Sequence, residues 1–219
     1  MTPNASDIFY QILGAIKSGQ PEWLQYSDLA PKDSAVVLDS LFDPRNGFED
    51  YRFRVHFSAP DRYLRVMMPT RLHEAGASWF AKQYAQWRVN GLIDDVGEDF
   101  LGLQPSPRIT NFTGHWSGSI KHPNYSVIPD GPNGYPTHFP SVVLESSWID
   151  TGMDDCRLWH EGSRGHVRVV ILDLFPVPNP VPANPTLTIE ELFGGCTPSG
   201  HIPETKLTLE LIERSDPIY

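Results

Sequence analysis

Three runs of sequence decide the fold of this chain: YSVIPD at residues 125–130, PSVVLESSW at 140–148 and HVRVVILDLF at 166–175. Each run has a continuous apolar centre, which is typical of strands that are covered on both faces of a sheet. The first two runs are separated by GPNGYPTHF, whose glycines and prolines predict a loop. We therefore expect these runs to form neighbouring interior strands.

The segment between the second and third runs predicts a helix. It reads TGMDDCRLWHEGSRG at residues 151–165, with Thr151 placed to cap the first turn. Two aspartates follow in that turn, where the helix dipole favours negative charge, and Gly162 or Gly165 can end the helix. Residues 125–175 therefore predict strand, loop, strand, helix and strand.

Two acidic residues stand out in this segment. Asp130 ends the first strand, and Glu145 directly follows the apolar run Val142–Leu144. If the strands are neighbours, facing side chains lie about 5 Å apart, and the two carboxylates can bind one cation. The simpler interpretation of Asp130 is an ordinary Pro-Asp-Gly turn. Glu145 is harder to explain without a partner, because a carboxylate in an interior strand is costly unless it is paired or ligated.

The order of these elements resembles the restriction-endonuclease-like, or PD-(D/E)XK, superfamily, and most nearly a group of uncharacterised fungal members. The resemblance is carried by MPTRLHEA, IPDG, PSVVLESSW, DCRLWHEG and HVRVVILDLF, in that order, within residues 65–175. It implies an α/β (α+β) fold with a mixed sheet and an αβββαβ core. An extra N-terminal helix and strands and a C-terminal strand pair complete the expected architecture.

The expected organisation is a single domain over residues 1–219. Its core spans about 63–175, and 1–62 form an N-terminal extension. Five prolines in PVPNPVPANP exclude a central strand, so 176–185 are expected to cross the molecule as an extended segment before peripheral strands in 186–219.

Outside the core, spacing predicts several further elements. Two helices are predicted. The first begins at Ser6 or Asp7 and ends at Gly19, and the second runs from Thr70 to Gly91. The predicted strands are 34–39, 51–57, 63–68, 100–103, 186–189 and 206–212.

What the resemblance implies is metal-dependent hydrolysis of phosphodiester bonds. Asp130, Glu145 and the backbone carbonyl of Ser146 would hold Mg²⁺ or Mn²⁺, and Glu74 would add an acidic group from the first core helix. Without the resemblance, Glu74 is equally well explained as a carboxylate at a helix N-terminus.

This chain departs from the superfamily pattern at one position. The motif lysine would fall at Ser147, and a serine cannot supply that fixed positive charge. Arg157 on the following helix is the candidate replacement, ahead of Arg164, although its spacing to Glu161 also suits a helical ion pair.

Four residues are candidates for binding substrate. Lys121 precedes the Asp130 strand and can reach a phosphate, and Ser147 takes the place of the lysine. Trp148 and Trp159 flank Glu145 and Arg157, where they can line an aromatic pocket, although tryptophan is more often core.

The absent lysine and the tryptophans support an alternative: a non-nuclease member of the same fold that acts on a small molecule or serves as a binding protein. A third interpretation is a structural partner in a complex, with a homodimer face on the C-terminal strands.

Composition limits these interpretations. The net charge of −10 opposes tight, non-specific binding to nucleic acid. The basic neighbourhood formed by the arginines at 52, 54, 62 and 65 is expected to be a solvated strand face. Two cysteines are too few for a disulfide framework or a four-cysteine zinc site. The lack of a membrane-length apolar run and of a basic-then-apolar N-terminus predicts an intracellular protein, cytoplasmic or nuclear, without membrane contact.

Overall fold

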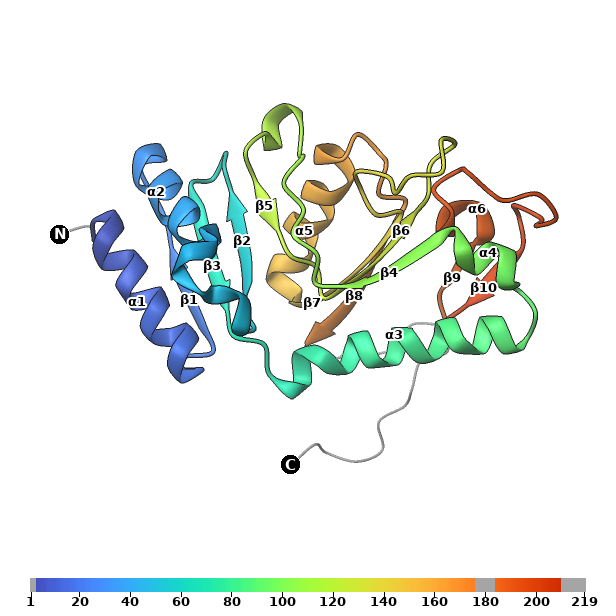
Figure 1. Cartoon of the computed structure of the whole chain (residues 1–219), viewed down its shortest axis with the longest axis horizontal. Helices are drawn as coiled ribbons and strands as arrows, with labels where there is room; N and C mark the ends of the chain where they lie inside the picture. The colour runs from blue at the N-terminus through green and yellow to red at the C-terminus, as the bar shows by residue number, and fades with distance from the viewer. Residues whose placement is uncertain (1–2, 176–183, 210–219) are drawn as a thin grey trace.

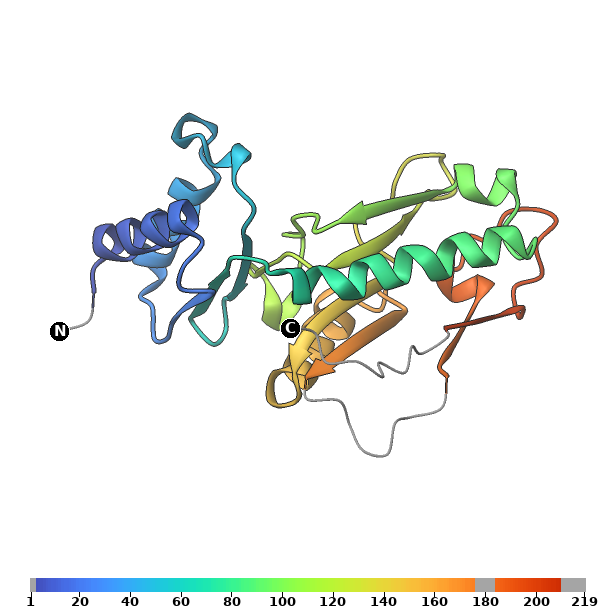
Figure 2. The same ribbon diagram turned by 90° about the horizontal axis from the view of Figure 1, so that it is seen from below.

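The structure is a computed structural model that describes residues 3–175 and 184–209. It has a mixed α/β architecture in which helices cover strands of antiparallel and mixed sheets. An N-terminal lobe, formed by residues 3–68 and the short strand β5 (Ile120–Lys121), lies beside the larger core rather than over either face of the core sheet (Figures 1 and 2). The core begins at Arg71, the first residue of helix α3.

The N-terminal lobe is a four-stranded sheet with two helices packed on one face. Its strands lie in the order β1-β3-β2-β5, so a short piece of chain from the core segment completes the sheet. The elements are α1 (Ala5–Ser18), β1 (Trp23–Tyr26), α2 (Pro31–Phe42), the 3-10 turns η1 (Pro44–Asn46) and η2 (Phe48–Asp50), β2 (Arg54–Ser58) and β3 (Tyr63–Met67).

Helix α1 confirms the predicted first helix, but its cap differs from the prediction. Ile8, Ile12 and Ile16 are buried at helical spacing, and Gly19 ends the helix in the left-handed region with φ 71°. The capping side chain is Asn4, which accepts a hydrogen bond from the Asp7 amide, so Ser6 and Asp7 lie inside the helix.

The strand predicted at residues 34–39 is wrong, because this segment lies in α2. The helix buries Val37, Leu38 and Leu41, a helical spacing that the short window 34–39 conceals. Pro31 at the first turn favours the helix, since proline there removes only an amide that has no partner inside the helix.

The core is built around a second four-stranded sheet, in the order β4-β6-β7-β8. β4, β6 and β7 are antiparallel neighbours, and β8 runs parallel to β7 after the crossover through α5. The elements are α3 (Arg71–Val89), α4 (Asp95–Asp99), β4 (Leu101–Pro105), the 3-10 turn η3 (Gly114–Trp116), β6 (Tyr125–Pro129), β7 (Val142–Trp148), α5 (Ile149–Gly162) and β8 (Val169–Phe175). Helix α5 begins before Thr151, which is therefore not its cap.

Alternation along β7 decides which residues meet which helix. Val142 and Leu144 belong to the apolar cluster with α3, whereas Val143 belongs to the cluster with α5. Figure 2 shows α3 across the near face of this sheet. Glu145 therefore points toward α5, and Ser146 points toward the beginning of α3.

The C-terminal segment confirms the predicted strand pair. β9 (Thr186–Thr188) and β10 (Lys206–Thr208) are antiparallel, and α6 (Ile189–Leu192) begins where the first predicted strand was expected to continue. The pair is less peripheral than expected, since buried Leu187 and Leu207 join the α3 cluster. Residues 210–212 of the predicted second strand, and 176–183 of the proline-rich crossing, lie outside the described residues.

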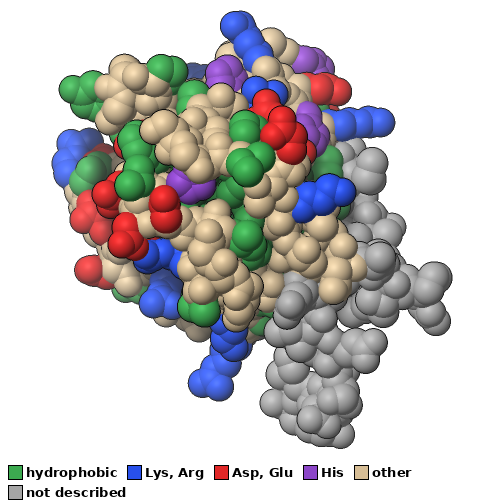
Figure 3. Space-filling view, turned by 90° about the vertical axis from the view of Figure 1, so that its right-hand side faces the viewer, with side chains coloured by type: hydrophobic (Ala, Val, Ile, Leu, Met, Phe, Trp, Pro, Cys, Tyr) green, Lys and Arg blue, Asp and Glu red, His purple; other side chains and the backbone are tan. Residues whose placement is uncertain are grey.

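The surface at this end of the molecule carries charges of both signs. On the face with α4, α6 and the β9–β10 pair, the described side chains form no continuous basic patch (Figure 3). Within residues 3–175 and 184–209, none of the helices has the length and apolar character of a membrane span.

Candidate functional site

Asp130 and Glu145 do not meet. In the antiparallel β6–β7 ladder, Tyr125 faces Leu144, so the position across from Glu145 is Asn124. Asp130 directly follows the other end of β6, six residues from Asn124 and about 20 Å away at the usual rise per residue. The predicted metal-binding pair is therefore not formed, because the end of one antiparallel strand lies beside the beginning of the next strand, not beside its end.

Asp130 instead takes the simpler role that its sequence context allowed. Its amide donates a hydrogen bond to the Phe100 carbonyl, and the Gly131 amide closes the following turn on the Tyr135 carbonyl. The Pro-Asp-Gly sequence is thus a turn at the far end of the sheet.

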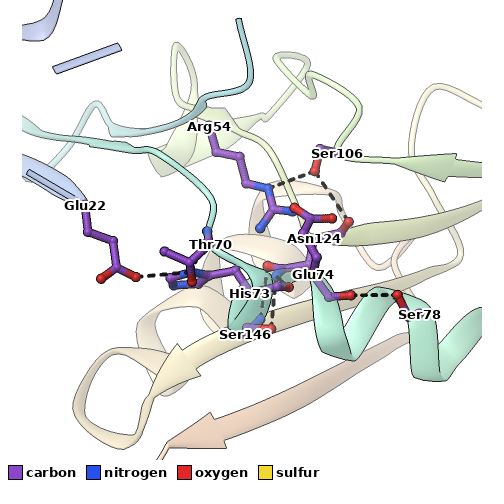
Figure 4. Close-up of polar contacts among 9 residues, drawn as sticks. All are labelled: Glu22, Arg54, Thr70, His73, Glu74, Ser78, Ser106, Asn124 and Ser146. Atoms are coloured by element: carbon purple, nitrogen blue, oxygen red, sulfur yellow. Dashed lines mark hydrogen bonds and ion pairs between the residues drawn. The ribbon is translucent and has the colours of Figure 1, made fainter. Parts of the chain in front are cut away.

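Asn124 ties three elements together at the near end of the sheet. Its side-chain amide group donates to the His73 carbonyl at 2.8 Å and to the Ser146 hydroxyl at 3.0 Å, and its Oδ1 accepts from the Ser146 amide at 3.1 Å. Figure 4 shows this group beside the first turn of α3. Asn124 is buried, and both N–H bonds of its side chain have acceptors.

Glu145 lies in a buried polar cluster formed by His56, Lys121, Glu145, Asp155 and Trp159. Its Oε1 accepts a hydrogen bond from Trp159 Nε1 at 2.8 Å and lies 3.7 Å from Lys121 Nζ. Lys121 Nζ is 2.5 Å from Asp155 Oδ1 and 2.9 Å from His56 Nδ1. The strands β2, β5 and β7 and the helix α5 each supply part of this cluster.

The pKa values of the cluster are displaced in opposite directions. Burial raises the pKa of Glu145 to about 7, against the opposing effect of the Lys121 charge. Burial also acts to raise the pKa of Asp155, but the positive charges of Lys121 and, to a smaller extent, Arg65 outweigh burial and the pKa is lowered. Lys121 is much closer to Asp155 than to Glu145, which accounts for the difference. Burial, followed by the Lys121 charge, holds the pKa of His56 well below its usual value, so His56 is neutral at pH 7.

Arg54 forms a second buried contact between the lobe and the core. Its NH2 lies 2.7 Å from Glu74 Oε1, and its Nε donates to the Ser106 hydroxyl at 2.8 Å (Figure 4). The Arg54 side chain is only 4% exposed, whereas the Glu74 side chain is 41% exposed. Glu74, to which the resemblance assigned an acidic role at the site, is paired with this arginine. The expectation of a solvated strand face is wrong for Arg54.

A cavity of about 20 Å³ lies between the N-terminal sheet and β7. By this measure a single water needs about 10–15 Å³, so the cavity accommodates a group of one or two atoms. It is partly open to solvent. Its lining includes the charged or titratable residues Arg54, His56, Arg65, Lys121, His122 and Glu145.

Other predicted site residues lie elsewhere. Arg157 is exposed, because Asp155, Leu158 and Trp159 form the buried side of α5 and Arg157 is two residues from Asp155 around the helix. Arg157 therefore does not join the buried cluster around Glu145, where its predicted role would place it. Arg164 is exposed and donates from Nε to the Thr113 hydroxyl at 3.1 Å.

The candidate substrate-binding residues have mixed outcomes. Lys121 is buried against Asp155, so it is not offered to a phosphate from solvent. Trp159 is fully buried and contacts Phe112 as well as Glu145. Ser147 and Trp148 are in β7, but their side chains lie outside the described residues.

The cluster does not fit a bound Mg²⁺ or Mn²⁺ ion. The described parts of the chain contain no group of three His, Cys, Asp or Glu side chains that could hold a metal. The position across from Glu145 is an amide whose donors are engaged, and the Lys121 ammonium already lies between the two buried carboxylates. A cation there would face electrostatic repulsion.

Sequence reasoning missed Arg54, His56, Asn124 and Asp155 as members of this site. Asp155 had a usable signal: it precedes Trp159 by four residues on α5, which places the two side chains on one face of the helix. Arg54 and His56 alternate with buried Val55 and Phe57, so their face of β2 is opposite the lobe's apolar core. Nothing in the sequence indicated that this face packs against carboxylates.

Comparison of the chain with protein-family models, with curated proteins and with solved structures gives no match.

Proposed function

We propose that this chain is a binding protein on a restriction-endonuclease-like fold and that it does not cut phosphodiester bonds through a metal-bound acidic pair. The element order α3, β4, β6, β7, α5, β8 supports the fold. So do the three antiparallel strands followed by a parallel fourth. In this arrangement Asn124, not Asp130, takes the position across from Glu145.

The observation that carries the proposal is the location of Lys121. Its ammonium is 2.5 Å from Asp155 and 3.7 Å from Glu145, and all three side chains are 5% exposed or less. An internal cation thus stands where the sequence suggested a metal ion. Because the ammonium is part of the folded chain, it neutralises the carboxylates without leaving a coordination position for substrate.

The size of the cavity favours a binding protein over a catalyst for a small molecule. Pockets that enclose such molecules have volumes of about 300–1,000 Å³. The cavity beside Glu145, at about 20 Å³, accepts part of a ligand but not a whole one. Recognition of a group presented from outside therefore suits this site better than enclosure of a substrate.

The first test measures metal binding and cleavage with the full chain. Calorimetric titration with Mg²⁺ and Mn²⁺ is expected to give no binding tighter than about 1 mM. Single- and double-stranded DNA and RNA are expected to stay intact with either metal. Cleavage by the wild type that is lost in Glu145→Gln would overturn the proposal.

A second test asks whether Lys121 occupies the cation position. In Lys121→Ser the two buried carboxylates lose the ammonium between them, so Mg²⁺ is expected to raise the melting temperature of this variant but not of the wild type. Lys17→Ser, at an exposed residue near the end of α1, is the matched control. Equal stabilisation of wild type and Lys121→Ser by Mg²⁺ would show that the ammonium does not replace a metal.

A further inference from the structure

Two residues that line the cavity each have a buried side-chain nitrogen with no hydrogen-bond partner among the described residues. These nitrogens are NH1 of Arg54 and Nε2 of His122. The remaining guanidinium nitrogens of Arg54 are engaged with Ser106 and Glu74. NH1 therefore carries two N–H bonds that need an acceptor, and leaving them unmet inside a protein is costly.

The charges around the cavity favour an anion over a neutral acceptor. Arg54 is paired with Glu74, and Lys121 is paired with Asp155. Arg65 has no carboxylate within 4 Å among the described residues, and its nearest polar contact is His56 Nδ1 at 3.5 Å. Since His56 is neutral at pH 7, the Arg65 charge has no close counter-ion among the described residues and acts on the Asp155 carboxylate only at longer range.

The size and opening of the cavity limit the form of the anion. A space of about 20 Å³ admits one oxygen atom, and the partial opening lets the rest of a larger group stay outside. Guanidinium groups bind the oxygens of phosphate and sulfate through charge-assisted hydrogen bonds.

We propose that the cavity between β2, β3 and β7 is an oxyanion site, in which Arg54 NH1 binds one oxygen of a phosphate or sulfate group and Arg65 supplies charge at the rim. The site rests on the proposed function, because it gives the binding protein its class of ligand. The phosphate group can be free or part of a larger molecule such as a nucleic acid.

Oxyanion binding at this place is linked to the protonation of Glu145, which also lines the cavity. Glu145 is faced by Lys121 of β5, Asp155 and Trp159 of α5, and Arg54 of β2. His56, Arg65 and His122 complete the surroundings of the cavity. An anion placed beside Glu145 disfavours its charged form, so binding takes up a proton and strengthens as the pH falls from 8 to 6.

The test is a calorimetric titration of the full chain with sodium sulfate, which does not titrate between pH 6 and 8. Inorganic phosphate and a short DNA duplex are separate arms, and they distinguish a free from a polymer-borne phosphate. We expect a dissociation constant on the order of 1 mM for sulfate. Arg54→Met is expected to weaken it by about 10-fold or more. Arg45→Met, which removes an exposed arginine paired with Asp43, is the matched control and is expected to leave affinity unchanged.

Arg65→Met protects the test from a folding defect in Arg54→Met, because it leaves the Arg54–Glu74 pair intact. Its affinity for sulfate is expected to fall about 5-fold or more, by loss of the rim charge. In Glu145→Gln the pH dependence of sulfate affinity is expected to disappear. Binding of chloride but not of sulfate or phosphate would mean that the cavity does not recognise an oxyanion, and no anion binding by the wild type would mean that it holds only water. Either result, or unchanged sulfate affinity in a folded Arg54→Met, would overturn the inference. The metal and cleavage measurements are independent, so failure of the oxyanion site leaves their result standing.

Discussion

Lys121 donates a hydrogen bond from Nζ to the Asp155 carboxylate across 2.5 Å, and both side chains are 3% exposed or less. Lys121 lies in β5, the strand that completes the sheet of the N-terminal lobe, and Asp155 lies in α5 of the core. The pair therefore fastens the two parts of the molecule together. The charges of Lys121 and Asp155 also influence the protonation of Glu145, the acidic residue that stood out most in the sequence.

Removing the Lys121 ammonium is expected to destabilise the protein strongly. Lys121→Met removes the cation nearest to the buried Asp155 carboxylate, with an expected loss of about 3–5 kcal/mol in the free energy of unfolding. Urea denaturation with an unchanged m value measures it. Lys32→Met, in the exposed first turn of α2, is the control and is expected to change stability little. The double variant Lys121→Met with Asp155→Leu should lose less than Lys121→Met alone; a larger loss would show that burial of charge is not the cause.

Restoring an acid across from Glu145 is expected to destabilise the protein rather than create a metal site. Asn124→Asp removes the donors to the His73 carbonyl and the Ser146 hydroxyl and is expected to cost about 2–4 kcal/mol at pH 7. The loss should shrink toward pH 4, because a protonated carboxyl regains one donor. Asn46→Asp is the control, since that amide donates to the Ser40 carbonyl at an exposed site. Equal effects of the two substitutions in thermal denaturation would contradict the role given to Asn124.

Glu145 is expected to make the protein less stable as the pH rises. Its pKa in the folded state is about 7, above the usual value of 4.5 for a glutamate, so the folded state binds more protons than the unfolded state between these values. The free energy of unfolding therefore falls through this window, by up to about 3 kcal/mol from this group. The lowered pKa values of His56 and His122 act in the opposite direction below pH 6.5.

The difference between the wild type and Glu145→Gln isolates this contribution. We expect the variant to lose the fall in stability between pH 4.5 and 7, as measured by urea denaturation at several pH values. Glu161→Gln, at an exposed carboxylate that accepts a hydrogen bond from Trp116, is expected to keep the wild-type dependence. A wild-type profile in Glu145→Gln would mean that Glu145 is ionised throughout.

Two glycine substitutions in helices are expected to have opposite signs. A Cβ at Gly162, near the end of α5, would lie 2.8 Å from a ring carbon of Phe112 and 3.2 Å from Trp116 Cβ. Gly162→Ala is expected to lose about 1–2 kcal/mol, because overpacking outweighs the gain in helix propensity. Gly14→Ala in α1 meets nothing within 4 Å and is expected to gain about 0.5–1 kcal/mol. Thermal denaturation of both variants checks this. Stabilisation by both would show that Phe112 and Trp116 can move away from an added Cβ without loss of stability.

Local pattern was enough to predict much of the architecture. The apolar runs in β6, β7 and β8, the stripe of α3 and the glycine that ends α1 all reflect contacts within a few residues. Such patterns can be recognised in the sequence without knowing which residues are neighbours in space. The failure at residues 34–39 has the same origin, since a six-residue window is too short to distinguish a strand from part of a helix.

The sequence by itself determined that Glu145 is an unusual residue, because a carboxylate after three apolar residues of an interior strand requires a partner. Only the tertiary structure decided that the partner is Lys121 with Trp159, not Asp130 with a metal ion. The physical reason is register: the antiparallel β6–β7 ladder brings Asn124 to Glu145 and carries Asp130 to the opposite end of the sheet. Pairing of β5 with β2 then delivers Lys121 from a different sheet, a long-range contact that no local spacing contains.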